Sequence, residues 1–187
     1  MLRSSLIALA LALLAGCGDR RLVIDIDVLS FVAQADRGTS FGPILPVPPD
    51  GAYLGETALV DAQEVKLLEG IEGITSVQSV TITANIFYRS TAGAGSDTVR
   101  LYLSDPATYP QSTPPVFTGA FVFTPGGSDS VQIDVGGDPR VVDLFNSRNF
   151  LFSLTTALRG PSSSPSLSGR VEIHSLHCIV ISSRKPL

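Results

Sequence analysis

Short runs of alternating apolar and polar residues recur along most of the chain, and they constrain its fold more than any other feature. In residues 22–29, the positions Leu22, Ile24, Ile26 and Val28 alternate with Val23, Asp25, Asp27 and Leu29. A period of two is typical of a β-strand with one buried face and one exposed face. Related runs follow at residues 77–88, 99–103, 117–123, 131–135, 150–158 and 171–181.

Glycine and proline clusters separate these runs, notably residues 92–95, 125–127 and 160–161. Short strands divided in this way are typical of antiparallel sandwiches and barrels rather than of alternating strands and helices. We therefore predict an all-β fold, an antiparallel β-sandwich that is either immunoglobulin-like or jelly-roll-like. The strand pattern leaves the choice between these two architectures open.

Two short helices are expected to interrupt the strands. Asp61 and Glu64 have the spacing of a capping box, which predicts a helix from Asp61 to about Gly70. A second helix is predicted to begin after Asp138, because Pro139 suits the first helical position, where its missing N–H costs no hydrogen bond.

The stretch from residue 34 to residue 58 is the least regular part of the sequence. It contains Pro43, Pro46, Pro48 and Pro49, which predict an irregular loop. A loop of this length within a compact domain is usually functional or a linker. We therefore expect the loop from Gln34 to Thr57 to be a contact surface.

The composition excludes several classes of function. The 187 residues include two His, two Cys and no Trp, and they carry a formal net charge of −4. A negative net charge argues against nucleic acid as a partner, because phosphates require clustered basic side chains. No glycine-rich phosphate-binding loop is present. We predict a protein that is not an enzyme and that uses no cofactor.

The first seventeen residues have the pattern of an export signal. Arg3 precedes an apolar run from Leu6 to Ala15, which is shorter than the about 20 residues that a membrane-spanning helix needs. Its length is that of the hydrophobic core of a signal peptide. The run ends in Leu14-Ala15-Gly16-Cys17. This tetrapeptide resembles the lipobox of bacterial lipoproteins, an aliphatic residue and two small residues before a cysteine.

The lipobox resemblance implies cleavage before Cys17 and lipidation of Cys17, with the membrane as a partner. The expected organisation is a signal peptide at residues 1–16, a lipidated anchor and short tether at residues 17–21, and one β-sandwich domain at residues 22–187. In that family an Asp after the cysteine is associated with retention in the inner membrane. Gly18 occupies this position, so we expect a lipid-anchored protein of the cell envelope, with the outer membrane favoured over the inner membrane.

Three residues near the C-terminus are metal-ligand types. On a regular strand His177 and Cys178 point to opposite faces, and His174 and Cys178 share a face but lie about 13 Å apart. One metal ion cannot bind both, so no metal site is predicted here. We expect a buried Cys178 and two ordinary strand histidines.

Acidic side chains provide two further candidates. Asp25 and Asp27 share a strand face about 7 Å apart, a spacing that invites comparison with glycosidase carboxylates, but a solvated strand face explains them better. Asp129, Asp134 and Asp138 are candidate calcium ligands beside Gly-rich turns. Turn formation explains the same residues without a metal.

The function most consistent with these observations is a non-catalytic binding or structural module of the cell envelope, in contact with another envelope protein. The alternative is a small-ligand or carbohydrate-binding sandwich, stabilised or not by calcium, that uses Tyr88, Tyr102 and loop acids. The sequence leaves both open.

Overall fold

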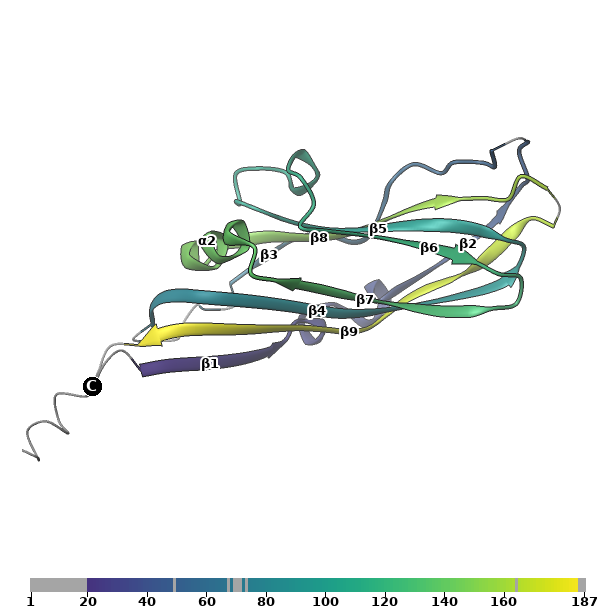
Figure 1. Cartoon of the computed structure of the whole chain (residues 1–187). Helices are drawn as coiled ribbons and strands as arrows, with labels where there is room; N and C mark the ends of the chain where they lie inside the picture. Colours follow the sequence, from purple (N-terminus) through teal and green to yellow (C-terminus); the bar gives the residue numbers. More distant parts are fainter. Residues whose placement is uncertain are drawn as a thin grey trace, which may run out of the picture.

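The computed structural model describes residues 20–48, 50–66, 68, 72, 74–163 and 165–184. The predicted signal peptide, Cys17 and most of the tether lie outside the described residues. Within the described part, two antiparallel sheets stack face to face (Figure 1). None of the helices in that part is long and apolar enough to cross a membrane.

Nine strands form the two sheets, and every pairing is antiparallel. The five-stranded sheet has the order β1 (Arg20–Asp27), β9 (Leu167–Arg184), β4 (Ile74–Ala92) and β7 (Ser128–Gly136), and β2 (Gly38–Ile44) also pairs with β9. The four-stranded sheet has the order β3 (Thr57–Val65), β8 (Phe150–Arg159), β5 (Gly95–Ser104) and β6 (Phe117–Phe123).

The order of these strands decides between the two sandwich architectures. With β2 set aside, the orders β1-β9-β4-β7 and β3-β8-β5-β6 place the eight remaining strands four to a sheet, with the chain crossing repeatedly between the sheets. This is the double Greek key of a jelly roll. The prediction of an all-β antiparallel sandwich is confirmed, and the kind of sandwich is jelly-roll-like.

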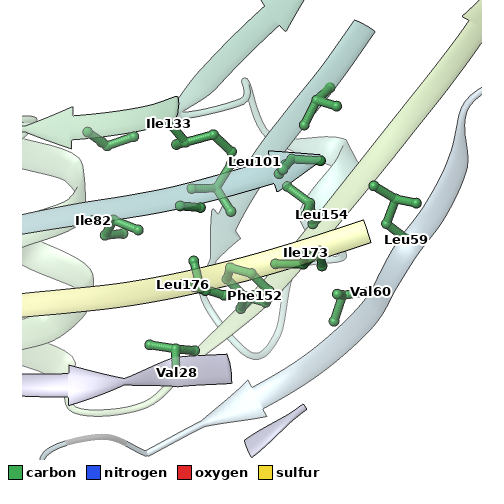
Figure 2. Close-up of a cluster of buried hydrophobic side chains, with 14 of the residues drawn as sticks. Val28, Leu59, Val60, Ile82, Leu101, Ile133, Phe152, Leu154, Ile173 and Leu176 are labelled. Atoms are coloured by element: carbon green, nitrogen blue, oxygen red, sulfur yellow. The ribbon is translucent and has the colours of Figure 1, made fainter. Parts of the chain in front are cut away.

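The core lies between the two sheets, where the inward side chains of both meet (Figure 2). Ile82 of β4 and Ile133 of β7 face Leu101 of β5 and Leu154 of β8, and all four are at most 4% exposed. The alternating pattern in the sequence therefore predicts the inward-facing residues of these strands correctly. At about 25 cal/mol per Å² of buried apolar surface, such a core needs no disulfide for its stability.

One of the two predicted helices is present. Helix α2 (Pro139–Ser147) begins after Asp138, whose carboxylate accepts a hydrogen bond from the Arg140 N–H at 2.9 Å. It ends at Arg148, which adopts the left-handed conformation at φ 65°. The short 3-10 helices η1 (Val28–Phe31), η2 (Gln34–Asp36) and η3 (Pro110–Ser112) complete the elements.

The helix predicted from Asp61 is wrong, because residues 61–65 belong to strand β3. The register between β3 and β8 shifts twice, between Ala58 and Val60 and between Val60 and Gln63. These irregularities remove the period-two pattern from the sequence of the strand. Pairing with β8 outweighs the local capping-box signal, since tertiary context overrides weak local preferences.

The irregular loop predicted for residues 34–58 is only partly correct. Strand β2 lies within it and pairs with β9, from Gly38 opposite Glu172 to Ile44 opposite Leu167. Pro43 is tolerated because β2 is an edge strand, where a missing N–H breaks no ladder. Residues 45–56, which we call the proline loop, are the irregular part, apart from one isolated bridge at Tyr53.

Strand β9 contains a β-bulge at His174. Asn85 of β4 pairs with Ser175, whereas the next residue, Ile86, pairs with Ile173, so His174 is an extra residue. The bulge exchanges the inward and outward positions of β9. Val171 and Ile173 are buried before it, and Leu176 and Cys178 are buried after it.

Candidate functional site

The two ends of strand β9 lie at opposite ends of the molecule (Figure 1). Arg20, the first described residue, pairs with Arg184 at one end, and Ile44, which precedes the proline loop, pairs with Leu167 at the other. The seventeen residue steps between Leu167 and Arg184 correspond to about 55 Å at about 3.3 Å per residue. The start of β1 and the proline loop are therefore separated by almost the length of the sandwich.

The proline loop exposes an unusual share of apolar side chains. Leu45 is 68% exposed and Tyr53 is 61% exposed, and Val47 and Leu54 are also exposed. These four make up half of the large exposed apolar side chains found among the described residues. Concentrated exposure of this kind marks interaction surfaces, whereas single exposed apolar residues do not.

The backbone of the proline loop is nevertheless held in place. The Val47 N–H donates to the Pro161 carbonyl at 3.1 Å, and the Leu54 N–H donates to the Leu158 carbonyl at 2.8 Å. The Gly160 N–H donates to the Ala52 carbonyl at 2.7 Å. A loop with a fixed backbone and exposed apolar side chains is organised to bind without a large loss of chain entropy.

Glu56 secures the C-terminal end of the loop to the outer side of the four-stranded sheet. Its carboxylate accepts hydrogen bonds from the Tyr102 hydroxyl at 2.8 Å, from the Thr155 hydroxyl and from the Arg100 guanidinium at 3.1 Å. Burial raises the pKa of Glu56, but these three donors outweigh burial and hold that pKa below its usual value. The ionised Glu56 side chain therefore attaches the end of the loop to strands β5 and β8.

A hollow of about 420 Å³ lies beside the proline loop. Its lining includes Asp50 of the loop, Ser96 of β5, Arg159 of β8 and Pro161. The Arg159 guanidinium donates to the Asp50 carbonyl at 3.3 Å. The proline loop and this hollow form the candidate contact surface. The loop lies within the predicted stretch from Gln34 to Thr57, whereas most of the lining of the hollow lies outside it.

The predicted lipidation residue, Cys17, lies outside the described residues. The other cysteine, Cys178, is buried as expected, and burial together with the nearby Asp25 raises the pKa of its thiol to about 12. The expectation that His174 and Cys178 share a strand face is wrong, because the bulge turns His174 outward. His174 and His177 are both exposed, and the His177 ring lies 3.7 Å from the Asp25 carboxylate.

The acidic candidates are not brought together. Asp129 and Asp134 lie five residues apart on β7, about 16 Å along the strand, and Asp138 is engaged as the cap of α2 and as the ion-pair partner of Arg140 at 2.7 Å. Asp27 caps η1, and Asp25 faces solvent. In the described part of the chain, no group of three or more His, Cys, Asp or Glu side chains has the arrangement of a metal site.

The two tyrosines of the alternative hypothesis are buried. Tyr88 is 1% exposed within the core, and Tyr102 is 5% exposed beneath the Glu56 contact. Neither ring is accessible for stacking against a sugar. The alternative hypothesis is therefore wrong about these residues.

Residues 38–42 match the spacing Gly-x-Ser-x-Gly, which in hydrolases places the nucleophilic serine on a sharp turn between a strand and a helix. Here Ser40 lies within the edge strand β2, opposite Arg170 of β9. The structural context of the motif is therefore not that of a nucleophile elbow.

A buried carboxyl group escaped the sequence reasoning. Asp97 of β5 is 1% exposed and accepts hydrogen bonds from the Thr156 hydroxyl and from the Ala157 N–H at 3.0 Å. Burial raises the pKa of Asp97 more than these donors lower it, and burial and the nearby Asp97 charge raise the pKa of Tyr88 as well. Asp97 lies two residues after the Gly-rich segment at residues 93–95, and its sequence context gives no sign that it points into the core.

No family model matches the chain, and no curated protein matches its sequence. Similar solved structures exist. One is the structure of infectious bursal disease virus Gx strain, at 12% identity and a TM-score of 0.43 over 89% of this chain and 38% of that chain. Another is the T13 particle of the same virus, at 14% identity and a TM-score of 0.39 over 89% of this chain and 36% of that chain.

The coat protein of Tobacco streak virus is also similar, at 18% identity and a TM-score of 0.25 over 76% of this chain and 93% of that chain. The chain spans well under half the length of the infectious bursal disease virus chains. At these identities and TM-scores the likeness carries no argument about function, and the fold follows from the strand order itself.

Proposed function

We propose that the chain is an exported lipoprotein that holds the proline loop away from a membrane, where the loop binds another protein of the cell envelope. In this proposal Cys17 carries the lipid, the β-sandwich is a rigid spacer, and the role is binding rather than catalysis.

The observation that carries the proposal is the register of β9. Cys17 precedes Arg20 by three residues, which reach at most about 11 Å when fully extended. Arg20 pairs with one end of β9, and the strand that leads into the proline loop pairs with the other end. A lipid at Cys17 would therefore hold one end of the sandwich close to the membrane and leave the loop at the far end.

The exposed apolar side chains of the loop support a protein partner. Interfaces gain most of their affinity from a few apolar or aromatic anchors that become fully desolvated. Leu45, Val47, Tyr53 and Leu54 can serve as such anchors because the backbone that carries them is already ordered.

The anchor is tested by intact mass and membrane fractionation of the full chain beside a Cys17→Ala variant. The proposal expects acyl mass and sedimentation with membranes for the wild type only. If both forms are soluble and carry no acyl mass, the lipoprotein part of the proposal fails.

The loop is tested by a photo-crosslinking amino acid placed in cells at Tyr53 or at Tyr109. Tyr109 is a matched control, because it is 62% exposed, as Tyr53 is 61% exposed, but precedes η3 and lines no part of the hollow beside the loop. We expect one discrete crosslinked protein from position 53 and none from position 109. Equal crosslinking at both positions, or none at position 53, contradicts the binding role of the loop.

A further inference from the structure

A second hollow, of about 210 Å³, lies on the outer face of the five-stranded sheet. Its polar lining residues come from three adjacent strands and are Thr83, Asn85, Gln132, Asp134 and Ser175. The register places them side by side, since Asn85 pairs with both Gln132 and Ser175, and Thr83 pairs with Asp134. Ile82, Ala84 and Ile86 point into the core, so Thr83 and Asn85 point outward into the hollow.

The polar side chains around this hollow have unused hydrogen-bonding capacity. Among the described residues, none of the five donates or accepts a side-chain hydrogen bond. The Asn85 Oδ1 atom is also buried without a partner there. A buried polar atom without a hydrogen bond costs about 1–3 kcal/mol, so its presence in a folded protein requires an explanation. A ligand that donates a hydrogen bond to Asn85 would supply one.

The bulge at His174 builds one wall of the hollow. Without it, Ser175 would continue the inward sequence of Leu167, Val171 and Ile173 and point into the core. The stacking of the His174 ring on Phe87, with centroids 5.0 Å apart, holds the extra residue on the outer face. Bulges frequently re-aim a side chain at a binding site.

The chemistry of the lining selects one class of ligand. Two amides and two hydroxyls both donate and accept hydrogen bonds, and the Asp134 carboxylate accepts them. A single carboxylate is a poor cation site, and the lack of a basic side chain in the lining disfavours an anion. Neighbouring hydroxyls on a sugar ring, each a donor and an acceptor, match this set. The volume is below the about 300–1,000 Å³ of sites for drug-sized ligands, which limits the occupant to about one ring.

We propose that this hollow binds one pyranose ring of a saccharide, with Asn85, Gln132 and Asp134 as the main hydrogen-bonding residues. The site does not depend on the lipid anchor or on the proline loop. A negative result for sugar binding would therefore leave the proposed anchor and loop untouched, and the reverse also holds.

The test is saturation-transfer NMR of the full chain in detergent with a panel of free hexoses and N-acetylhexosamines. Gln132→Ala and Asp134→Asn are compared with the wild type. Asp129→Asn is the matched control, because Asp129 is also an exposed aspartate of β7 but does not line the hollow. We expect at least one sugar to bind to the wild type. Its affinity should be about tenfold lower for the two hollow variants and unchanged for the control.

Failure of every sugar in the panel to bind overturns the proposal, as does binding that the hollow variants leave unchanged. Thermal unfolding of each variant checks that it is folded. A parallel measurement with isolated cell-wall polysaccharide identifies the source of the ring. Binding of polymer that is lost in the same variants indicates a ring within a polysaccharide, and binding of free sugars alone indicates a soluble ligand.

Discussion

Asp97 has the most unfavourable position for a charge, since it is the one acidic side chain that the described residues place in the core. Its carboxyl group lies between the sheets, close to Tyr88 of β4 and hydrogen-bonded to Thr156 of β8. Burial makes its pKa higher in the folded chain than in the unfolded chain. Ionisation of Asp97 therefore opposes folding, and the cost appears as the pH rises from the unfolded pKa through the raised folded pKa.

We expect Asp97→Asn to raise the melting temperature at pH 7, because the amide buries no charge. Its oxygen can accept from the Ala157 N–H, and its NH2 group can donate to the oxygen of the Thr156 hydroxyl. The advantage of the variant should shrink as the pH falls toward 4, because the cost of a buried charge is lost as the pH falls through the raised folded pKa of Asp97 toward its unfolded pKa. Thermal unfolding between pH 4 and pH 8 measures the difference. Thr156→Val should lower stability by about 1.5–3 kcal/mol at pH 7, because it leaves the carboxylate short of a donor. A stability difference between Asp97→Asn and the wild type that does not change with pH would contradict this account.

The contribution of Glu56 to stability depends on pH in the opposite direction to that of Asp97. Its donors hold its folded pKa below the unfolded value, so its contribution to stability is present above the unfolded pKa and is lost as the pH falls through the folded pKa. We expect Glu56→Gln to cost about 0.5–1.5 kcal/mol at pH 7 and less near pH 3, which lies below the unfolded pKa. Denaturant unfolding at the two pH values measures this, and Glu64→Gln on the exposed part of β3 serves as the control. An equal cost at both pH values would show that the charge of Glu56 is not what holds the loop.

At the scale of single elements, the sequence predicted the strands that keep a run of alternating apolar and polar residues and missed the strands that lack one. Residues 80–88 and 131–135 alternate regularly and lie in β4 and β7. Strand β3 shifts register twice, and β2 is a short edge strand without alternation, so neither showed a strand pattern. A bulge such as the one at His174 adds one residue without any sequence mark, so the outward facing of His174 and Ser175 could not be predicted.

The bulge makes a single-residue deletion in the middle of β9 tolerable. Removing His174 leaves every other inward and outward position of β9 unchanged and removes the register shift between Asn85 and Ile86, so we expect a loss of at most about 1–3 kcal/mol. Deleting Thr83 from the facing strand shifts the rest of β4 by one position and turns Ile86 and Tyr88 outward. The free-energy cost of that deletion should exceed the total stability of about 5–15 kcal/mol, so the variant should be unfolded.

Circular dichroism and thermal unfolding of the two deletion variants compare them directly. If the His174 deletion unfolds the chain as completely as the Thr83 deletion, the bulge is an essential part of the fold rather than an insertion into a regular strand.

At the scale of the whole molecule, the candidate sites differ in how far the sequence could locate them. The proline loop is contiguous in sequence, and its prolines identified it. The polar hollow is assembled from three strands that are far apart in the chain, and Ser175 reaches it only because of a bulge. Its residues looked like ordinary outward positions of a sheet. Only the strand order, which local patterns do not determine, brings them together.

If Cys17 carries a lipid, as proposed, the length of the sandwich predicts a distance that can be measured on lipid vesicles. A fluorophore at Leu45→Cys should transfer little energy to an acceptor dye in the bilayer, because about 55 Å of β9 separates the two ends. A fluorophore at Asp143→Cys should transfer much more, because α2 is attached near the start of β4 by the hydrogen bond between Asn146 and the Val77 N–H at 2.8 Å. Equal transfer from both positions would mean that the sandwich lies flat on the membrane.

The edge of the five-stranded sheet also determines how the molecule would respond to force. Strands β1 and β2 lie one after the other along the same strand, β9, and a pull between the N-terminal end and the proline loop acts parallel to both. The hydrogen bonds of each ladder would then be loaded in shear, so that all eight residue pairs of β1 share the tension at once instead of opening one after another. A sandwich built in this way would be mechanically stiff along its long axis, which suits the proposed role of a spacer.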